Sequence, residues 1–220
     1  MSGGLLRTDA VAAFARARGD MLTLVTMQAV EPWNALGQAD SRNFNVVGCM
    51  GSAASIGLGL ALARPRDRVL VLDGDGSLLM QLGTLASVGD RQPANLYHAV
   101  FENGIYETSG GQSVPGRGRA DLAKLALAAG YRHARRFSSP EELDEGIDGA
   151  LRETGPVFLA LAIAGPGTIA AAVPRVPNKA AQVATMRAAL SGDEGQPEHV
   201  LREIGLSEDE IGPLAGPNPR

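Results

Sequence analysis

Two short polar segments carry oxygen atoms of the kind that bind a hard metal ion. Residues 73–77 read DGDGS, and residues 102–106 read ENGIY. A carboxylate from Asp75, a side-chain amide from Asn103 and a backbone carbonyl are ligands that Mg2+ accepts, and phosphates and water usually complete its octahedron. The glycines on both sides of Asp75 let the backbone approach an anion closely. Together the two segments predict a site for a divalent cation and a phosphate-bearing ligand.

Each polar segment follows an apolar run that is typical of a short buried strand, at residues 68–72 and 96–101. In open parallel sheets, ligands bind outside the carboxyl ends of the strands. We therefore expect Asp75 and Asn103 to lie side by side at one edge of a sheet. Ser77 is expected to open the next helix, so that backbone N–H groups point toward the same place.

Two other interpretations of the first segment are open. Asp73, Asp75 and Ser77 alternate as in an EF-hand calcium loop, but positions six and twelve of that loop are Leu78 and Thr84 instead of Gly and Glu. An ordinary strand, turn and helix with solvated acids accounts for the first segment and leaves the second unexplained. The pairing of the two segments favours the metal site.

The rest of the chain alternates strands with helices. Further strands are expected at 22–26, 133–137 and 157–163, and helices at 5–18, 77–88, 121–129 and 139–153. Asp121 and Ser139 are expected to cap the last two of these helices. This order predicts an α/β fold with a doubly wound, mostly parallel sheet flanked by helices.

A glycine-rich turn at 48–51 precedes a helix of small and apolar residues. Residues 31–42 are expected to form a polar loop, in which Trp33 serves packing or an interface. Residues 107–119 are rich in glycine and are expected to form a loop that closes over the ligand. His98 lies in a strand pattern and is expected to be a core residue.

Composition suggests a division near residue 164. The first part, 1–164, is expected to be the folded domain, and 165–220 a C-terminal tail with short helices near 180–190 and 198–204. The net charge of −4, the lack of a basic block and an aromatic content of 4% argue against a nucleic-acid partner. Cys49 is the only cysteine, which fits a reducing compartment. No apolar run reaches about 18 residues, so we expect a cytoplasmic protein without membrane contact.

The spacing of the two polar segments resembles a family motif. Gly74-Asp75-Gly76, followed after residues 77–101 by Glu102-Asn103, is similar to the metal and diphosphate motif of thiamine diphosphate-dependent enzymes, which is Gly-Asp-Gly, a comparable spacer and usually Asn-Asn. Glu102 departs from that pattern. The resemblance implies thiamine diphosphate and Mg2+ as cofactors, with the metal held by Asp75, Asn103 and the carbonyl of Ile105. It further implies cofactor contacts from Gly74, Gly76, Ser77, Tyr106 and Thr108.

The same resemblance gives roles to two residues of the glycine-rich turn. The carbonyl of Gly48 would accept a hydrogen bond from the 4′-amino group of the cofactor, and Met50 would be the apolar wedge beneath the bent cofactor. A flexible thioether suits such a gap-filling task. The alternative for Met50 is an ordinary core position.

Within the family, residues 48–51, 74–80, 103–106 and 109–112 look most like sulfopyruvate decarboxylase beta subunits and the C-terminal part of phosphonopyruvate decarboxylases. Those enzymes decarboxylate 2-oxo acids that bear a second anionic group, although Ser52 stands where they often have histidine. Their activating glutamate lies on a pyrimidine-binding domain. Only 47 residues precede Gly48, so we expect a separate partner subunit to supply that glutamate within a hetero- and homo-oligomer.

Two other functions are compatible with these residues. Glu102, Ser52 and the tail would suit a non-catalytic cofactor-binding or scaffold subunit. The chain would also suit another thiamine diphosphate enzyme, such as an acetolactate synthase-like enzyme or a 2-oxo acid oxidoreductase. The lack of cysteine clusters for iron–sulfur centres weighs against the oxidoreductase.

Overall fold

The computed structural model describes residues 4–164 and 179–190. A six-stranded sheet forms its centre, and every pair of neighbouring strands in it is parallel. Its order is β2 (Asn43–Val46), β1 (Leu22–Thr26), β3 (Val69–Gly74), β4 (Leu96–Glu102), β8 (Val157–Ala162) and β7 (His133–Phe137). The inner strands are covered on both faces, which explains why their sequences are continuous apolar runs.

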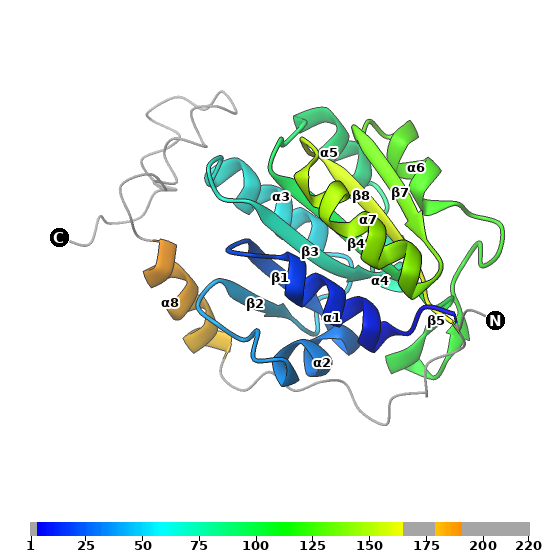
Figure 1. Ribbon diagram of the computed structural model, residues 1–220, viewed down its shortest axis with the longest axis horizontal. Helices are drawn as coiled ribbons and strands as arrows, with labels where there is room; N and C mark the ends of the chain where they lie inside the picture. The colour runs from blue at the N-terminus through cyan, green and yellow to red at the C-terminus, as the bar shows by residue number, and fades with distance from the viewer. Residues whose placement is uncertain (1–3, 165–178, 191–220) are drawn as a thin grey trace.

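Helices cover both faces of the sheet, as expected for a doubly wound fold (Figure 1). One face carries α1 (Arg7–Ala17), α2 (Val30–Ala35) and α7 (Pro140–Arg152). The other face carries α3 (Ala53–Ala63), α4 (Asp75–Met80), α5 (Thr84–Arg91) and α6 (Leu122–Ala128). The predicted fold class is therefore confirmed.

Shorter elements complete the described chain. The 3-10 turns are η1 (Met27–Ala29) and η2 (Glu107–Ser109), and a small antiparallel pair joins β5 (Ile105–Tyr106) to β6 (Gln112–Ser113). Helix α8 (Lys179–Leu190) lies beside the edge strand β2. Arg64, which directly follows α3, donates to the carbonyl of Leu190 over 2.8 Å. The helix expected at 180–190 is thus confirmed, and the one near 198–204 falls outside the described residues, as does most of the predicted tail.

The predicted helix caps are present. Oγ of Ser139 accepts a hydrogen bond from the backbone N–H of Glu142 over 3.2 Å, and the Glu142 carboxylate accepts from the N–H of Ser138 over 2.7 Å. The Asp121 carboxylate accepts from the N–H of Lys124 over 3.1 Å. Both caps satisfy N–H groups that have no partner within their own helix.

Three expectations about local structure are wrong. Residues 77–88 form two helices, α4 and α5, and the first begins at Asp75 and not at Ser77. The chain turns at Gln81 because the end of α4 abuts the turn at Gly51, where an added Cβ would lie 3.0 Å from the Gln81 Cβ. The supposed loop 31–42 begins with α2, because Trp33 is fully buried in the core and Pro32 lies in the first turn, where its missing N–H costs little.

The structure differs from the prediction in two further places, an additional strand and short regular elements within a predicted loop. Strand β2 has the sequence NFNV, and its two asparagines are buried and bonded to each other over 3.0 Å. Within 107–119, η2 and β6 replace a structureless loop. Among the described residues, we find no helix with the length and apolar character needed to cross a membrane.

Helix α3 lies against the sheet at Gly57, and this contact gives a prediction on stability. A Cβ at Gly57 would lie 2.4 Å from Cγ2 of the buried Val71, whereas a Cβ at Gly59 on the same helix would meet no atom within 4 Å. Gly57→Ala should lower the free energy of unfolding by about 1–3 kcal/mol because of overpacking. Gly59→Ala, the matched control, should raise it by about 0.5–1 kcal/mol. Urea denaturation measures both, and equal effects would contradict the packing found here.

Candidate functional site

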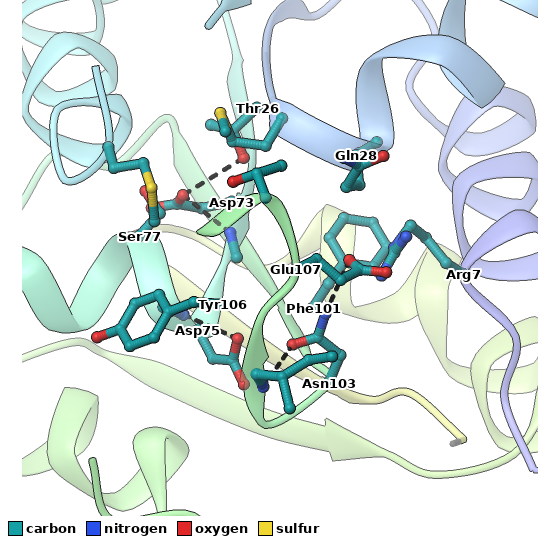
Figure 2. A pocket seen from close by; sticks show the side chains of 17 residues that line it. Arg7, Thr26, Gln28, Asp73, Asp75, Ser77, Phe101, Asn103, Tyr106 and Glu107 are labelled. Carbon is teal, nitrogen blue, oxygen red and sulfur yellow. Dashed lines mark hydrogen bonds and ion pairs between the residues drawn. The ribbon is translucent and has the colours of Figure 1, made fainter. Parts of the chain in front are cut away.

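The main candidate site is a cavity at the carboxyl ends of β1, β3 and β4 (Figure 2). The chain leaves β1 toward β2 on one side and returns to β3 on the other, so β1 and β3 flank the point where the strand order reverses. Such a switch point is the usual ligand site of an open α/β sheet. The cavity has a volume of about 490 Å³, open solvent included.

Most of the residues predicted from the sequence line this cavity. They are Met50, Gly74, Asp75, Gly76, Ser77, Asn103, Ile105, Tyr106 and Thr108. Gly48 does not line it. Gly48 is exposed in the turn before α3, with a φ of +80° that favours glycine. The predicted role of its carbonyl therefore concerns a surface outside the cavity.

Asp75 joins the two polar segments. Its Oδ1 accepts a hydrogen bond from the N–H of Gly76 over 2.8 Å, and its Oδ2 accepts from the N–H of Gly104 over 2.7 Å. Burial raises the pKa of the Asp75 carboxyl above its ordinary value, and the two N–H donors oppose that shift. Each carboxylate oxygen can accept more than one bond. The carboxylate can therefore hold the loops together and also bind a cation.

Both polar atoms of the Asn103 side-chain amide form hydrogen bonds within the described chain. Its Oδ1 accepts from the N–H of Ile105 over 3.0 Å, and its Nδ2 donates to Oε2 of Glu107 over 2.9 Å. The same Oε2 lies 2.5 Å from Nη2 of Arg7. Neither Arg7 nor Glu107 was predicted from the sequence. Glu107 could have been noticed four residues after Asn103, but no local pattern connects it with Arg7, which lies 100 positions away.

The end of β1 and the turn after it add three further residues that were not predicted, Thr26, Met27 and Gln28. Met27 has a φ of +43°, which is strained for a residue other than glycine. Nε2 of Gln28 is buried, and no described residue accepts its hydrogen bond. Strain beside an unsatisfied buried donor is typical of a ligand-binding wall. This wall faces the Asp75 loop, because Oγ1 of Thr26 lies 3.5 Å from Oδ1 of Asp73.

Two close contacts join neighbouring loops around the cavity. Oγ of Ser77 accepts from the N–H of Gly51 over 3.0 Å, which connects α4 to the turn that carries Met50. Gly76 packs under the ring of Tyr106, where an added Cβ would lie 2.7 Å from ring carbons. Glycine at position 76 is thus needed for the approach of the β5 strand.

The side chain of Glu102, which departs from the family motif, lies outside this cavity. It lines a neighbouring hollow of about 1140 Å³, open solvent included, and forms an ion pair with Arg136. Burial raises the pKa of Glu102, and Arg136 opposes that shift. Asp75 and Asn103 also line this hollow, and the charge of Asp75 adds to the upward pKa shift of Glu102.

His98 is fully buried in β4, as expected for a core residue. Its Nδ1 lies 3.1 Å from the hydroxyl of Tyr131, and its Nε2 lies 3.6 Å from Oδ2 of Asp73. The contact with Asp73 places it behind the cavity wall and not within the lining.

The chemistry of the lining suits a diphosphate with a hard cation. No group of three or more His, Cys, Asp or Glu side chains among the described residues is placed to hold a metal ion. The available oxygens are one carboxylate, one side-chain amide and backbone carbonyls, a small set of the kind that Mg2+ completes with phosphate oxygens. The unsatisfied donor of Gln28 and the apolar surfaces of Met50 and Ile105 suit a ligand with an anionic end and an apolar body.

Comparison with known proteins identifies the protein family of this chain. Residues 24–161 match the family model described as "Thiamine pyrophosphate enzyme, C-terminal TPP binding domain", and the chain belongs to this family. A structure from Mycobacterium smegmatis, described as a thiamin diphosphate-dependent enzyme, is similar in fold, with a TM-score of 0.62 and 18% identity over 74% of this chain and 32% of that one. The fold and the thiamine pyrophosphate-binding domain expected from the sequence are confirmed.

Curated proteins with similar sequences are named as two kinds of decarboxylase. The chain is 45% identical over 128 residues to phosphonopyruvate decarboxylase of Streptomyces viridochromogenes, which is 58% of this chain and 32% of the relative. It is 39% identical over 112 residues to sulfopyruvate decarboxylase subunit beta of Methanocaldococcus jannaschii, which is 51% of this chain and 58% of the relative. The chain thus spans about a third of the first protein and less than two thirds of the second. These are the two groups that the motifs predicted.

Proposed function

We propose that this chain supplies the diphosphate and magnesium half of the active site of a thiamine diphosphate-dependent 2-oxo acid decarboxylase. The observation that carries the proposal is the junction of Asp75 and Gly104, which brings the two predicted metal-binding segments together at the switch point of the sheet. The names of the relatives in the two decarboxylase groups support a substrate similar to sulfopyruvate or phosphonopyruvate.

The residues of the cavity have three roles in this proposal. Oxygens of Asp75, Asn103 and the Ile105 carbonyl would hold Mg2+. The segment 74–77, Thr108 and Gln28 would donate hydrogen bonds to the diphosphate, and Met50 would support the ring end. The bound cofactor would act as the electron sink when carbon dioxide leaves a 2-oxo acid.

Among the described residues, the acids of this cavity already contact neighbouring groups of the chain. Its acids are Asp73, Asp75 and Glu107. Oδ1 of Asp73 accepts from the N–H of Gly74, while its Oδ2 has no hydrogen-bond partner in the described chain and lies 3.6 Å from Nε2 of the buried His98. Asp75 joins the two loops, and Glu107, the glutamate of this lining, is paired with Arg7 and Asn103. We therefore propose that the glutamate comes from a separate pyrimidine-binding subunit. The beta-subunit names of three relatives support this division.

The alternative of a non-catalytic subunit rested on Glu102, Ser52 and the tail, and the structure bears on Glu102. Its side chain is paired with Arg136 in the neighbouring hollow, so the substitution does not remove a ligand from the proposed metal site. The intact set of cavity residues favours the catalytic role.

A calorimetric titration tests the cofactor site. Thiamine diphosphate with Mg2+ is titrated into the chain, and again with the expected pyrimidine-domain subunit present. We expect saturable binding that Asp75→Ala abolishes, because the variant removes both a metal ligand and the acceptor for Gly104. Asp90→Ala removes an exposed carboxylate outside the cavity and should leave binding unchanged. Equal affinity of wild type and Asp75→Ala would refute the proposed site.

Decarboxylation assays test the division of the active site. The chain with thiamine diphosphate and Mg2+ should release carbon dioxide from sulfopyruvate or phosphonopyruvate only when the partner subunit is added, because the proposal assigns the activating glutamate to that subunit. Release is measured against time with each component omitted in turn. Normal enzymatic turnover by the chain alone would contradict the proposed partner.

A further inference from the structure

An ion pair between Arg7 and Glu107 forms one wall of the cavity (Figure 2). Arg7 is the first residue of α1, and Glu107 is the first residue of η2, directly after β5. The Arg7 side chain is 18% exposed and that of Glu107 is 6% exposed. The N-terminal helix α1 thus places a guanidinium group beside the loop that carries Asn103.

The orientation of the Asn103 amide depends on Glu107. The carboxylate accepts from Nδ2, while Oδ1 accepts from the N–H of Ile105. A carboxylate is only an acceptor and a backbone N–H is only a donor. Turning the amide over would place its oxygen against the carboxylate and its NH2 against the N–H of Ile105. Glu107 therefore keeps the oxygen of Asn103 on the side of the metal-binding loop.

The same carboxylate would harm the proposed site if it lacked a counter-charge. It is almost fully buried, and an unpaired buried charge is costly. It also lines the cavity that receives a diphosphate, an anion that a second free negative charge would repel. Arg7 supplies the compensating positive charge.

We propose that Arg7 and Glu107 are positioning residues for the cofactor site, an inference that rests on the proposed function. Glu107 fixes the amide of Asn103 so that its oxygen is available to the cation. Arg7 neutralises Glu107 so that the cavity accepts a polyanion. Neither residue needs to touch the metal to have this effect.

Titration of thiamine diphosphate with Mg2+, with the pyrimidine-domain subunit present, tests the role of Arg7. Arg7→Gln should weaken the binding of thiamine diphosphate and Mg2+ by about 10–100-fold, the usual effect of substituting a residue that supports a metal ligand without binding the metal itself. The control is Arg16→Gln on the same helix as Arg7, which breaks an exposed pair with Asp144 of α7 and should leave binding unchanged. The double variant Arg7→Gln, Glu107→Gln should bind more tightly than Arg7→Gln alone, because it removes the uncompensated charge.

Hydrogen exchange of the Asn103 side chain tests the role of Glu107 without any bound cofactor. The NH2 signals are assigned by their loss in Asn103→Asp. Glu107→Ala should speed their exchange with water by about tenfold or more, since an exchange-protecting acceptor is removed. Glu107→Gln retains an acceptor and should largely restore the slow exchange.

The outcomes separate this inference from the proposed function. If Asp75→Ala binds as well as wild type, the proposed function fails. If Asp75→Ala loses binding while Arg7→Gln matches Arg16→Gln, only the role of Arg7 is overturned. A double variant as weak as Arg7→Gln would also overturn charge compensation, because it would indicate direct contact between Arg7 and the anion. Unchanged exchange in Glu107→Ala would overturn the role of Glu107.

Discussion

The hydrogen bond from the N–H of Gly104 to the carboxylate of Asp75, 2.7 Å long, connects the loops after β3 and β4. Without it, the two segments that carry the proposed metal ligands would be separate turns at the carboxyl ends of two strands. Burial raises the pKa of Asp75, so keeping this carboxylate ionised costs free energy that two backbone donors partly offset. A bound cation would complete that compensation, which explains why a buried acid is placed here.

The scaffold brings these loops together through close packing. Parallel register between β3 and β4 runs to Gly74 and Phe101, so both strands end at the same level. Gly57 lets α3 lie against β3, and Gly76 lets α4 lie under Tyr106. The wall on the other side comes from the turn after β1 and from Arg7 of α1. Segments from five parts of the chain, including the turn that carries Met50, are thereby held around one cavity.

Features that depend on local sequence could be predicted. Strands β3 and β4 were recognisable as apolar runs, and the caps at Asp121 and Ser139 as local hydrogen-bond signals. Features that depend on tertiary contacts were missed. The break between α4 and α5 arises from contact with Gly51, and the pairing of Arg7 with Glu107 joins residues 100 positions apart. The site was therefore predicted as a set of ligands, without the residues that hold those ligands in place.

Electron–nuclear double resonance with Mn2+ in place of Mg2+ tests the central claim most directly. The chain is labelled with 13C at its aspartate carboxylates and studied with thiamine diphosphate and the partner subunit. We predict that one bound Mn2+ couples both to 31P of the diphosphate and to 13C of one aspartate, and that Asp73→Asn retains the 13C coupling. A 31P coupling without a 13C coupling would show that Asp75 does not bind the metal and would contradict the account.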